Sequence, residues 1–181
     1  IRQFGILEGG DLSILLGINE EGGLEGMYAF SLFDPWQEDD NGIFNEVLAH
    51  ETIHCWIGLR VGDYDDPWWK EGTTNYLGLL ITKRNNLCSQ ALLEGTLLAD
   101  LSTANDVLNY ALSDDYVRFN LFAENNNCVK LVYIKGAQVN MLLDNQIRKI
   151  SQSQFSLDKV LAQFKDIYLD RAFSRQEYLD F

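Results

Sequence analysis

Residues 50–54 have the sequence His50-Glu51-Thr52-Ile53-His54, and the prediction of the fold and of the chemistry starts from this stretch. On an α-helix, positions i and i+4 lie one above the other, so both imidazoles face the same side. The chain has only two histidines, and both lie here. Imidazoles at this spacing can bind one zinc ion, with the intervening glutamate beside the metal's open position. The alternative is a pair of hydrogen-bonded core histidines.

The residues around this stretch predict a buried helix from about Ile43 to Leu59, because they are apolar on nearly every side. Burying two imidazoles and a carboxylate in such a helix is costly unless a partner satisfies them. A divalent metal would do so.

A zinc site with a reactive water needs a third protein ligand. We expect it to be Glu71, in Trp68-Trp69-Lys70-Glu71-Gly72, near the start of a second helix predicted from Trp69 to Lys83. Asn75, one turn later, would lie on the same face and hydrogen-bond a ligand imidazole. Taken alone, Glu71 would be a solvated carboxylate at a helix start.

The rest of the chain predicts a small sheet followed by a helical body. Asp11–Ile18 and Met27–Phe33 have strand composition, and Gly22, Gly23 and Gly26 are expected in a turn between them. Further helices are predicted at 89–102 and 105–112, from Cys128 to Ile150 with one apolar face, after Ser156, and after a Ser174–Glu177 capping box. We expect one domain of the α+β class.

Composition and charge exclude several classes of protein. The chain has 181 residues, 46% of them hydrophobic, which is typical of one globular domain with a good core. Its formal net charge of −13 disfavours nucleic acids and anionic lipid surfaces as partners. No apolar run approaches the roughly 18 residues needed to cross a bilayer. Of the three cysteines, Cys88 and Cys128 are candidates for a disulfide, which the sequence leaves open.

The run HETIHCWIGL, followed after a short loop by WWKEGTTNYLG, resembles the gluzincin metallopeptidases, whose third zinc ligand is a Glu on the next helix. It is most similar to the glycyl-aminopeptidase family, with the aminopeptidase N family as a near relative. Three other stretches agree: GGLEG at 22–26, YIKGA at 133–137 and SLDKVLA at 156–162. The loop between His54 and Glu71 is shorter than usual in the aminopeptidase N family, which favours the first family.

The resemblance implies a role for each matching residue. His50, His54 and Glu71 would bind one zinc ion per chain, and Glu51 would be the general base. Tyr133 would stabilise the oxyanion, although a tyrosine here can also be a core residue. Substrate binding would fall to the three residues of the glycine segment: Glu25 on the substrate amine, with the backbone of Gly22 and Gly23 on the peptide. Composition alone would make Glu25 part of a solvated acidic loop.

The resemblance also implies a thermolysin-like catalytic domain over residues 1–181, cut from a longer chain with flanking domains. The expected function is a zinc metallopeptidase that removes small N-terminal residues from peptides. An endopeptidase with the same machinery is the alternative if Glu25 does not reach the cleft. A catalytically silent peptide-binding module is a third possibility. The compartment cannot be predicted.

Overall fold

The structure is a computed structural model. It describes the backbone of residues 13–17, 22–26 and 29–33, and both backbone and side chains of 42–58, 60–61, 67–101 and 126–181, apart from the side chain of Arg175. The helix expected at 105–112 lies outside these residues, as does Leu59.

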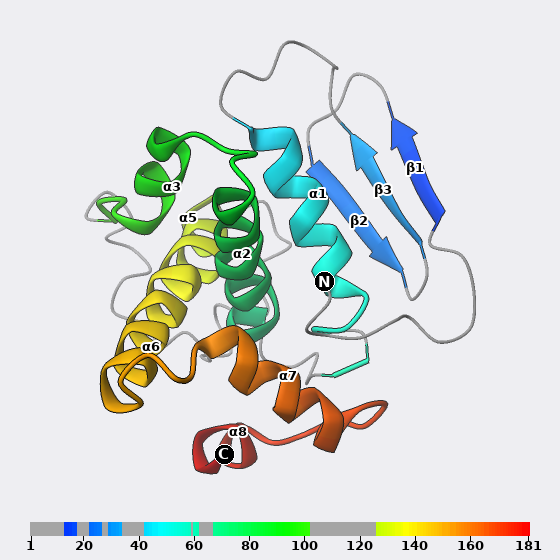
Figure 1. The fold of residues 1–181 in the computed structure, drawn as a ribbon. Coiled ribbons are helices and arrows are strands. Elements are labelled where there is room, and N and C mark those ends of the chain that lie inside the picture. The colour runs from blue at the N-terminus through cyan, green and yellow to red at the C-terminus, as the bar shows by residue number, and fades with distance from the viewer. Residues whose placement is uncertain are drawn as a thin grey trace.

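Three short strands lie beside the first helix. They are β1 (Ser13–Gly17), β2 (Gly22–Gly26) and β3 (Ala29–Phe33), in the order β1-β3-β2. β1 pairs with β3 in parallel, and β2 pairs with β3 in antiparallel fashion. β2 is therefore an edge strand, and it is the strand closest to helix α1 (Figure 1). The prediction of a turn at Gly22, Gly23 and Gly26 is wrong, because pairing with β3 overrides the low strand preference of glycine.

The predicted α+β class needs a correction. Wherever the structure describes side chains, it contains helices, turns and two isolated β-bridges, Ile57–Val61 and Val61–Arg171, but no strand. The part of the molecule that packs the described core is therefore helical. The sheet is limited to three strands of five residues, described by backbone alone. Among the described side chains, the apolar faces of the helices bury one another, as Trp69 of α2 does against Phe164 of α7.

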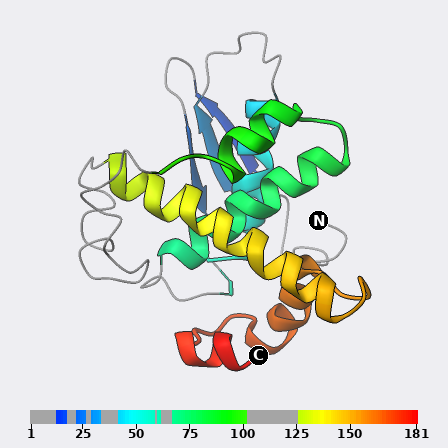
Figure 2. The same ribbon diagram turned by 90° about the vertical axis from the view of Figure 1, so that its left-hand side faces the viewer.

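The helical body is built in layers beside the sheet. α1 (Ile43–His54) lies between the sheet and α2 (Pro67–Arg84), and α2 lies between α1 and α6 (Gly136–Ile150) (Figure 1). α6 crosses α2 obliquely (Figure 2). The remaining elements are α3 (Gln90–Leu97), α5 (Asn126–Val129), the π-helix η2 (Lys130–Lys135), α7 (Leu157–Tyr168) and α8 (Arg175–Asp180).

Most predicted helices are present, with shifted ends. α1 begins at Ile43 as predicted but ends at His54, where turns lead to Gly58 at φ 86°. α3 covers only part of the predicted 89–102. Ser156 is the N-cap of α7, and Ser174 and Glu177 form the predicted capping box of α8. The capping box is confirmed, whereas Ser156 has the predicted N-cap position but its side chain makes no capping hydrogen bond.

The long helix predicted from Cys128 to Ile150 is interrupted. α5, η2 and α6 follow one another without a break in the chain, but the middle turn has π geometry. The expected apolar face is only partly buried, because Leu143 and Ile150 are 38% and 75% exposed. The buried residues of α6 are instead small or polar: Gly136, Ala137, Asn140 and Asp144.

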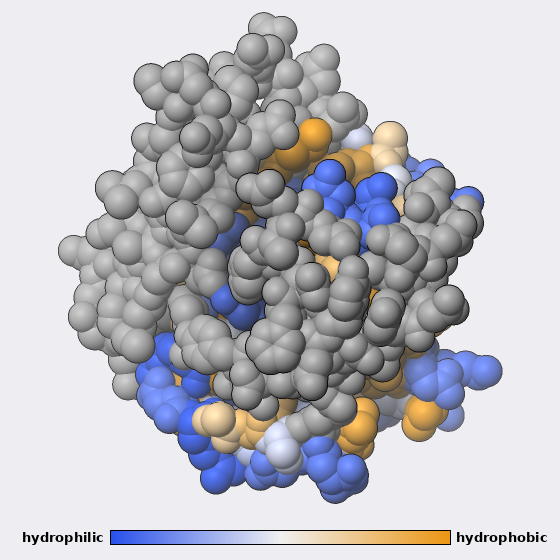
Figure 3. Space-filling model, turned by 180° about the vertical axis from the view of Figure 1, so that it is seen from behind, coloured by the Kyte–Doolittle hydropathy of each residue, from blue (hydrophilic) through white to orange (hydrophobic). Residues whose placement is uncertain are grey.

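The described core is rich in aromatic residues. Trp69 packs against Phe164, Phe173 and Tyr178, which joins α2 to α7 and α8. All three cysteines are free, so the possible Cys88–Cys128 bridge is absent. On the face seen in Figure 3, hydrophobic and hydrophilic residues adjoin along the lower edge, where α7 and α8 lie. None of the helices described reaches the length and hydrophobicity of a membrane span.

Candidate metal centre

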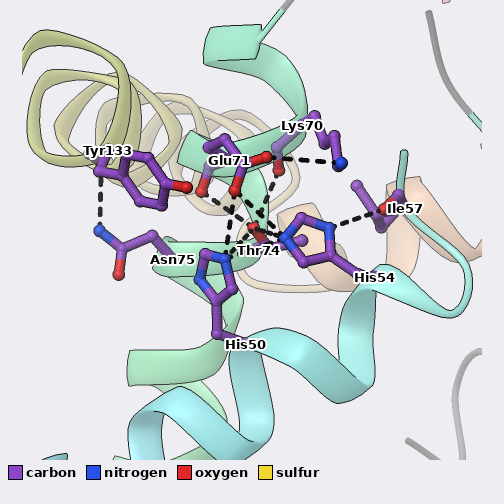
Figure 4. Close-up of polar contacts among 8 residues, drawn as sticks. All are labelled: His50, His54, Ile57, Lys70, Glu71, Thr74, Asn75 and Tyr133. Carbon is purple, nitrogen blue, oxygen red and sulfur yellow. Dashed lines mark hydrogen bonds and ion pairs between the residues drawn. The ribbon is translucent and has the colours of Figure 1, made fainter. Parts of the chain in front are cut away.

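His50, His54 and Glu71 come together between α1 and α2 (Figure 4). Each offers one ligand atom, and these atoms all lie within 4.8 Å of one another. The two imidazoles lie on the same side of α1 because their residues are one turn apart, and their ring planes meet at 76°. Glu71 faces them from the second turn of α2. The cluster predicted from the motif spacing is therefore present as a spatial unit.

The spacing of the ligand atoms fits a small tetrahedral ion. The two Nε2 atoms are 2.9 Å apart, and Glu71 Oε2 lies 3.3 Å from that of His50 and 3.2 Å from that of His54. Bonds of about 2.0–2.1 Å to zinc at tetrahedral angles place ligand atoms about 3.3 Å apart. The exposed fractions of His50, His54 and Glu71 are 6%, 1% and 7%. The geometry, the burial and the donor set of two nitrogens and one oxygen all fit zinc.

A neighbouring carbonyl orients the second imidazole. His54 Nδ1 lies 3.1 Å from the Ile57 carbonyl oxygen, which can only accept a hydrogen bond. Nδ1 therefore carries the proton, and Nε2 presents its lone pair to the cluster. The turn after α1 thus selects the tautomer that a metal requires.

The electrostatics of Glu71 favour the carboxylate. Burial by itself raises the pKa of Glu71, but hydrogen bonds with His50 and His54 outweigh it and hold the pKa far below its ordinary range. Lys70 Nζ lies 3.6 Å from the other carboxylate oxygen, Oε1. Its stem passes over Gly58, where a Cβ would lie 2.3 Å from Lys70 Cγ. Glu71 therefore directs Oε2 to the imidazoles and Oε1 to a lysine.

Asn75 does not have its predicted partner. Its Nδ2 donates to the backbone carbonyl of Tyr133 at 3.1 Å, rather than to a ligand imidazole. The hydroxyl of Thr74 lies next to the imidazoles instead, 3.3 Å from His50 Nε2 and 3.5 Å from His54 Nε2. The correction follows from helix geometry: Thr74 and Asn75 both follow Glu71 by about one turn, but Thr74 is turned toward the histidines and Asn75 toward η2.

Tyr133 lies beside the cluster. Its ring stacks on that of His50, with centroids 5.8 Å apart and planes at 16°. In Figure 4 the hydroxyl points toward Glu71. This location is compatible with the predicted role on the oxyanion, which stays a prediction.

Two close contacts between helices bring these residues together. A Cβ on Gly72 would lie 2.6 Å from Gly136 Cα, so the backbones of α2 and α6 touch next to Glu71 and Tyr133. A Cβ on Gly78 would lie 3.2 Å from Glu46 Oε1 and 3.3 Å from His50 N, so α2 also approaches α1 closely. Neither contact was predicted, because a glycine inside a helix does not show which other helix packs against it.

Two carboxylates of α1 lie near the cluster, one buried and one partly buried. Glu51, the predicted base, is 6% exposed. Glu46, one turn before His50, is a residue that the sequence motifs do not name. Burial raises its pKa, and its Oε1 has no hydrogen-bond partner among the described residues. Its position four residues before His50 was the available signal.

The predicted substrate residues are described only in part. Gly22, Gly23 and Glu25 lie in β2, opposite Phe33, Leu32 and Phe30 of β3. β2 lies next to α1, so the glycine segment is in the strand of the sheet that neighbours the histidine helix. The side chain of Glu25 lies outside the described structure.

Three solved structures have a similar fold. An aminopeptidase N family protein from Idiomarina loihiensis matches with a TM-score of 0.76 and 17% identity over 92% of this chain. An M1 zinc metallopeptidase from Deinococcus radiodurans matches with a TM-score of 0.67 and 20% identity over 98% of this chain. A two-domain M1 zinc metallopeptidase, a glutamate-to-alanine mutant bound to L-tryptophan, matches with 0.62 and 20% over 92%.

The chain has the fold of a gluzincin metallopeptidase. It spans about a third of the length of these structures, namely 35%, 37% and 34%. No family model matches the sequence, and no curated protein does. The structures belong to the group expected as the near relative, so the predicted gluzincin resemblance is confirmed for the fold. The narrower assignment to the glycyl-aminopeptidase family stays a prediction.

Proposed function

We propose that this chain is the zinc-binding catalytic part of a metallopeptidase, and that it removes N-terminal residues from peptides. The observation that carries the proposal is the buried cluster of His50, His54 and Glu71, with ligand atoms at the spacing of a tetrahedral zinc site. The similarity to zinc metallopeptidase structures supports the same metal. The chain spans only part of those structures, so the peptidase activity of the complete protein is itself part of what we propose.

Each residue near the cluster has a proposed task. Zinc, when bound, lowers the pKa of a water to about 7 and polarises a carbonyl group. Glu51, between the two histidines in sequence, would accept the water proton and deliver it to the leaving amine. Tyr133, stacked beside His50, would donate a hydrogen bond to the oxyanion.

The location of β2 supports the exopeptidase form of the proposal. β2 has one neighbour in the described sheet and lies beside α1, so its outer edge is suited to pairing with an extended peptide. Glu25 in this strand would bind the free α-ammonium group, and the negative net charge favours such cationic ends. Small residues such as Gly or Ala are the proposed substrates.

Metal analysis of the purified protein, with activity measured before and after chelation, tests the proposal. We expect one zinc per chain and loss of turnover that zinc restores. Glu51→Gln should abolish turnover while zinc stays bound. A peptide with a free N-terminus should be cleaved and its N-acetylated form should not; equal rates would indicate an endopeptidase. A zinc-loaded parent without turnover would instead favour a binding module.

A further inference from the structure

The π-helix η2 places Tyr133 in an unusual backbone environment. A π turn widens the helix, and in proteins such turns occur often at functional sites. Here the Gly136 N–H is shared between the carbonyls of Leu131 and Tyr133. The Tyr133 carbonyl thus accepts a hydrogen bond inside the widened turn, and it accepts another from outside the helix.

Asn75 supplies this outside donor from the neighbouring helix α2. Its Nδ2 lies 3.1 Å from the Tyr133 carbonyl oxygen, and the residue is 9% exposed. Asn75 is one helical turn after Glu71, on the same face of α2. One face of one helix thus carries the candidate carboxylate ligand and the amide that holds the backbone of the candidate oxyanion donor (Figure 4).

This hydrogen bond links the orientation of the tyrosine to the metal cluster. The ring of Tyr133 is nearly parallel to that of His50, at 16°, and its hydroxyl is directed toward Glu71 (Figure 4). A π turn that relaxed to α geometry would rotate each side chain on the helix by a fraction of a turn. The amide of Asn75 opposes this rotation at the residue whose direction matters.

We propose that Asn75 is a positioning residue: by donating to the Tyr133 carbonyl it holds the η2 turn in the register that directs the Tyr133 hydroxyl at the metal cluster. The proposal deepens the proposed function and rests on it for its catalytic consequence. Its structural part, the restraint of η2 by Asn75, is independent of any activity.

The test compares Asn75→Leu, Tyr133→Phe and the double variant in the zinc-loaded 181-residue chain, with L-alanine 4-nitroanilide as substrate. Leucine has nearly the shape of asparagine and removes the donor. We expect Asn75→Leu to lower kcat by about 10- to 100-fold and to leave KM within about threefold. In the Tyr133→Phe background the same change should lower kcat by less than about twofold, because the hydroxyl that it positions is already gone.

Two measurements without turnover accompany the kinetics. Hydrogen–deuterium exchange of a peptide covering residues 130–137 should accelerate in Asn75→Leu, while zinc affinity, measured against a chromophoric chelator, stays within about threefold. Asn85→Leu is the matched control. Asn85 directly follows the same helix and its Nδ2 also donates to a backbone carbonyl, that of Ile81 at 2.8 Å, but at the exposed far end. It should change none of these values.

Several results would overturn the proposal. If hydrogen exchange at residues 130–137 is unchanged in Asn75→Leu, Asn75 does not restrain η2. If Asn75→Leu lowers kcat equally with and without the Tyr133 hydroxyl, Asn75 does not act through Tyr133. If Asn75→Leu does not fold, Asn75→Ala, which removes the donor without adding a branched apolar group, is measured in the same way. A zinc-loaded parent that shows faster exchange on substitution but has no turnover would refute the proposed function and the catalytic consequence, while the restraint of η2 would stand.

Discussion

Replacing Gly136 by alanine should separate Tyr133 from the metal cluster while leaving the three candidate ligands in place. Gly136 begins α6, three residues after Tyr133, whereas His50, His54 and Glu71 belong to α1 and α2. The variant therefore addresses the contact between two helices without touching a ligand.

The size of the effect follows from the contact distances. A Cβ on Gly136 would lie 2.8 Å from Gly72 Cα and 3.0 Å from the Trp68 carbonyl oxygen, whereas ordinary contacts begin at 3.4 Å. The shortfall from 3.4 to 2.8 Å, about 0.6 Å, must be met by separating the helices, because both neighbours are backbone atoms. Such overpacking costs about 1–3 kcal/mol, and the better helix propensity of alanine offsets up to about 1 kcal/mol. We expect a net loss of about 1–2 kcal/mol, or about 2–8 °C in Tm.

Turnover should fall more than stability. A displacement near 1 Å at a catalytic group can cost about 100-fold, so about 0.6 Å at Tyr133 should lower kcat by roughly tenfold or more. Zinc affinity should stay within about threefold, because all three candidate ligands belong to α1 and α2, and the contact between these two helices at Gly78 is unchanged. Urea unfolding, steady-state kinetics and chelator competition measure the three quantities.

Gly95→Ala is the control for this variant. Gly95 is also inside a helix, α3, but a Cβ there would meet nothing within 4 Å. It should be neutral or stabilising by up to about 1 kcal/mol, with unchanged kinetics. If Gly136→Ala behaved in the same way, the close approach at Gly72 would not be what positions Tyr133, and the reasoning would be refuted.

Three further variants test the site and the fold. Glu71→Gln should weaken zinc binding by at least about 100-fold in chelator competition, and an unchanged affinity would place the third ligand elsewhere. Tyr133→Phe should lower kcat by about 100- to 1000-fold with KM nearly unchanged, and a change in KM alone would contradict an oxyanion role. Burial raises the pKa of Asp158, but hydrogen bonds from Ser156 and Arg84 outweigh it and lower that pKa below its ordinary 3.8. The pair is therefore stabilising above pH 3.8 and its contribution is lost as the pH falls through the lowered pKa. Arg84→Met should cost about 1–2 kcal/mol in urea unfolding at pH 7 and progressively less as the pH falls below 3.8; a cost that does not change with pH would contradict this.

The sequence predicted the local part of the site and missed the part that depends on tertiary contacts. His50 and His54 are one turn apart on the same helix, so their approach needs only helix geometry. The hydrogen-bond partner of Asn75 depends on how α2 packs against η2. Helical periodicity shows which residues share a face of a helix, but not which element packs against that face. The π turn itself was missed because its residues, Lys130–Lys135, have ordinary helical composition. The glycine segment in β2 was missed for the opposite reason: its composition indicates a turn, and the strand exists through pairing with β3.

The glycines of α2 explain how a nonlocal site can arise from a short motif. Glu71 must reach α1 on one side and lie beside Tyr133 on the other, and α2 has a glycine at each approach: Gly78 against Glu46 and His50, and Gly72 against Gly136. Each glycine weakens the isolated helix by about 1 kcal/mol relative to alanine. That cost is tolerated where a side chain would force the neighbouring helix away from the cluster. In a helix that carries a candidate ligand, an interior glycine therefore indicates a close helix contact beside the site. The stretch EGTTNYLG contains two such glycines: Gly72 directly follows Glu71, and Gly78 lies against the backbone of His50.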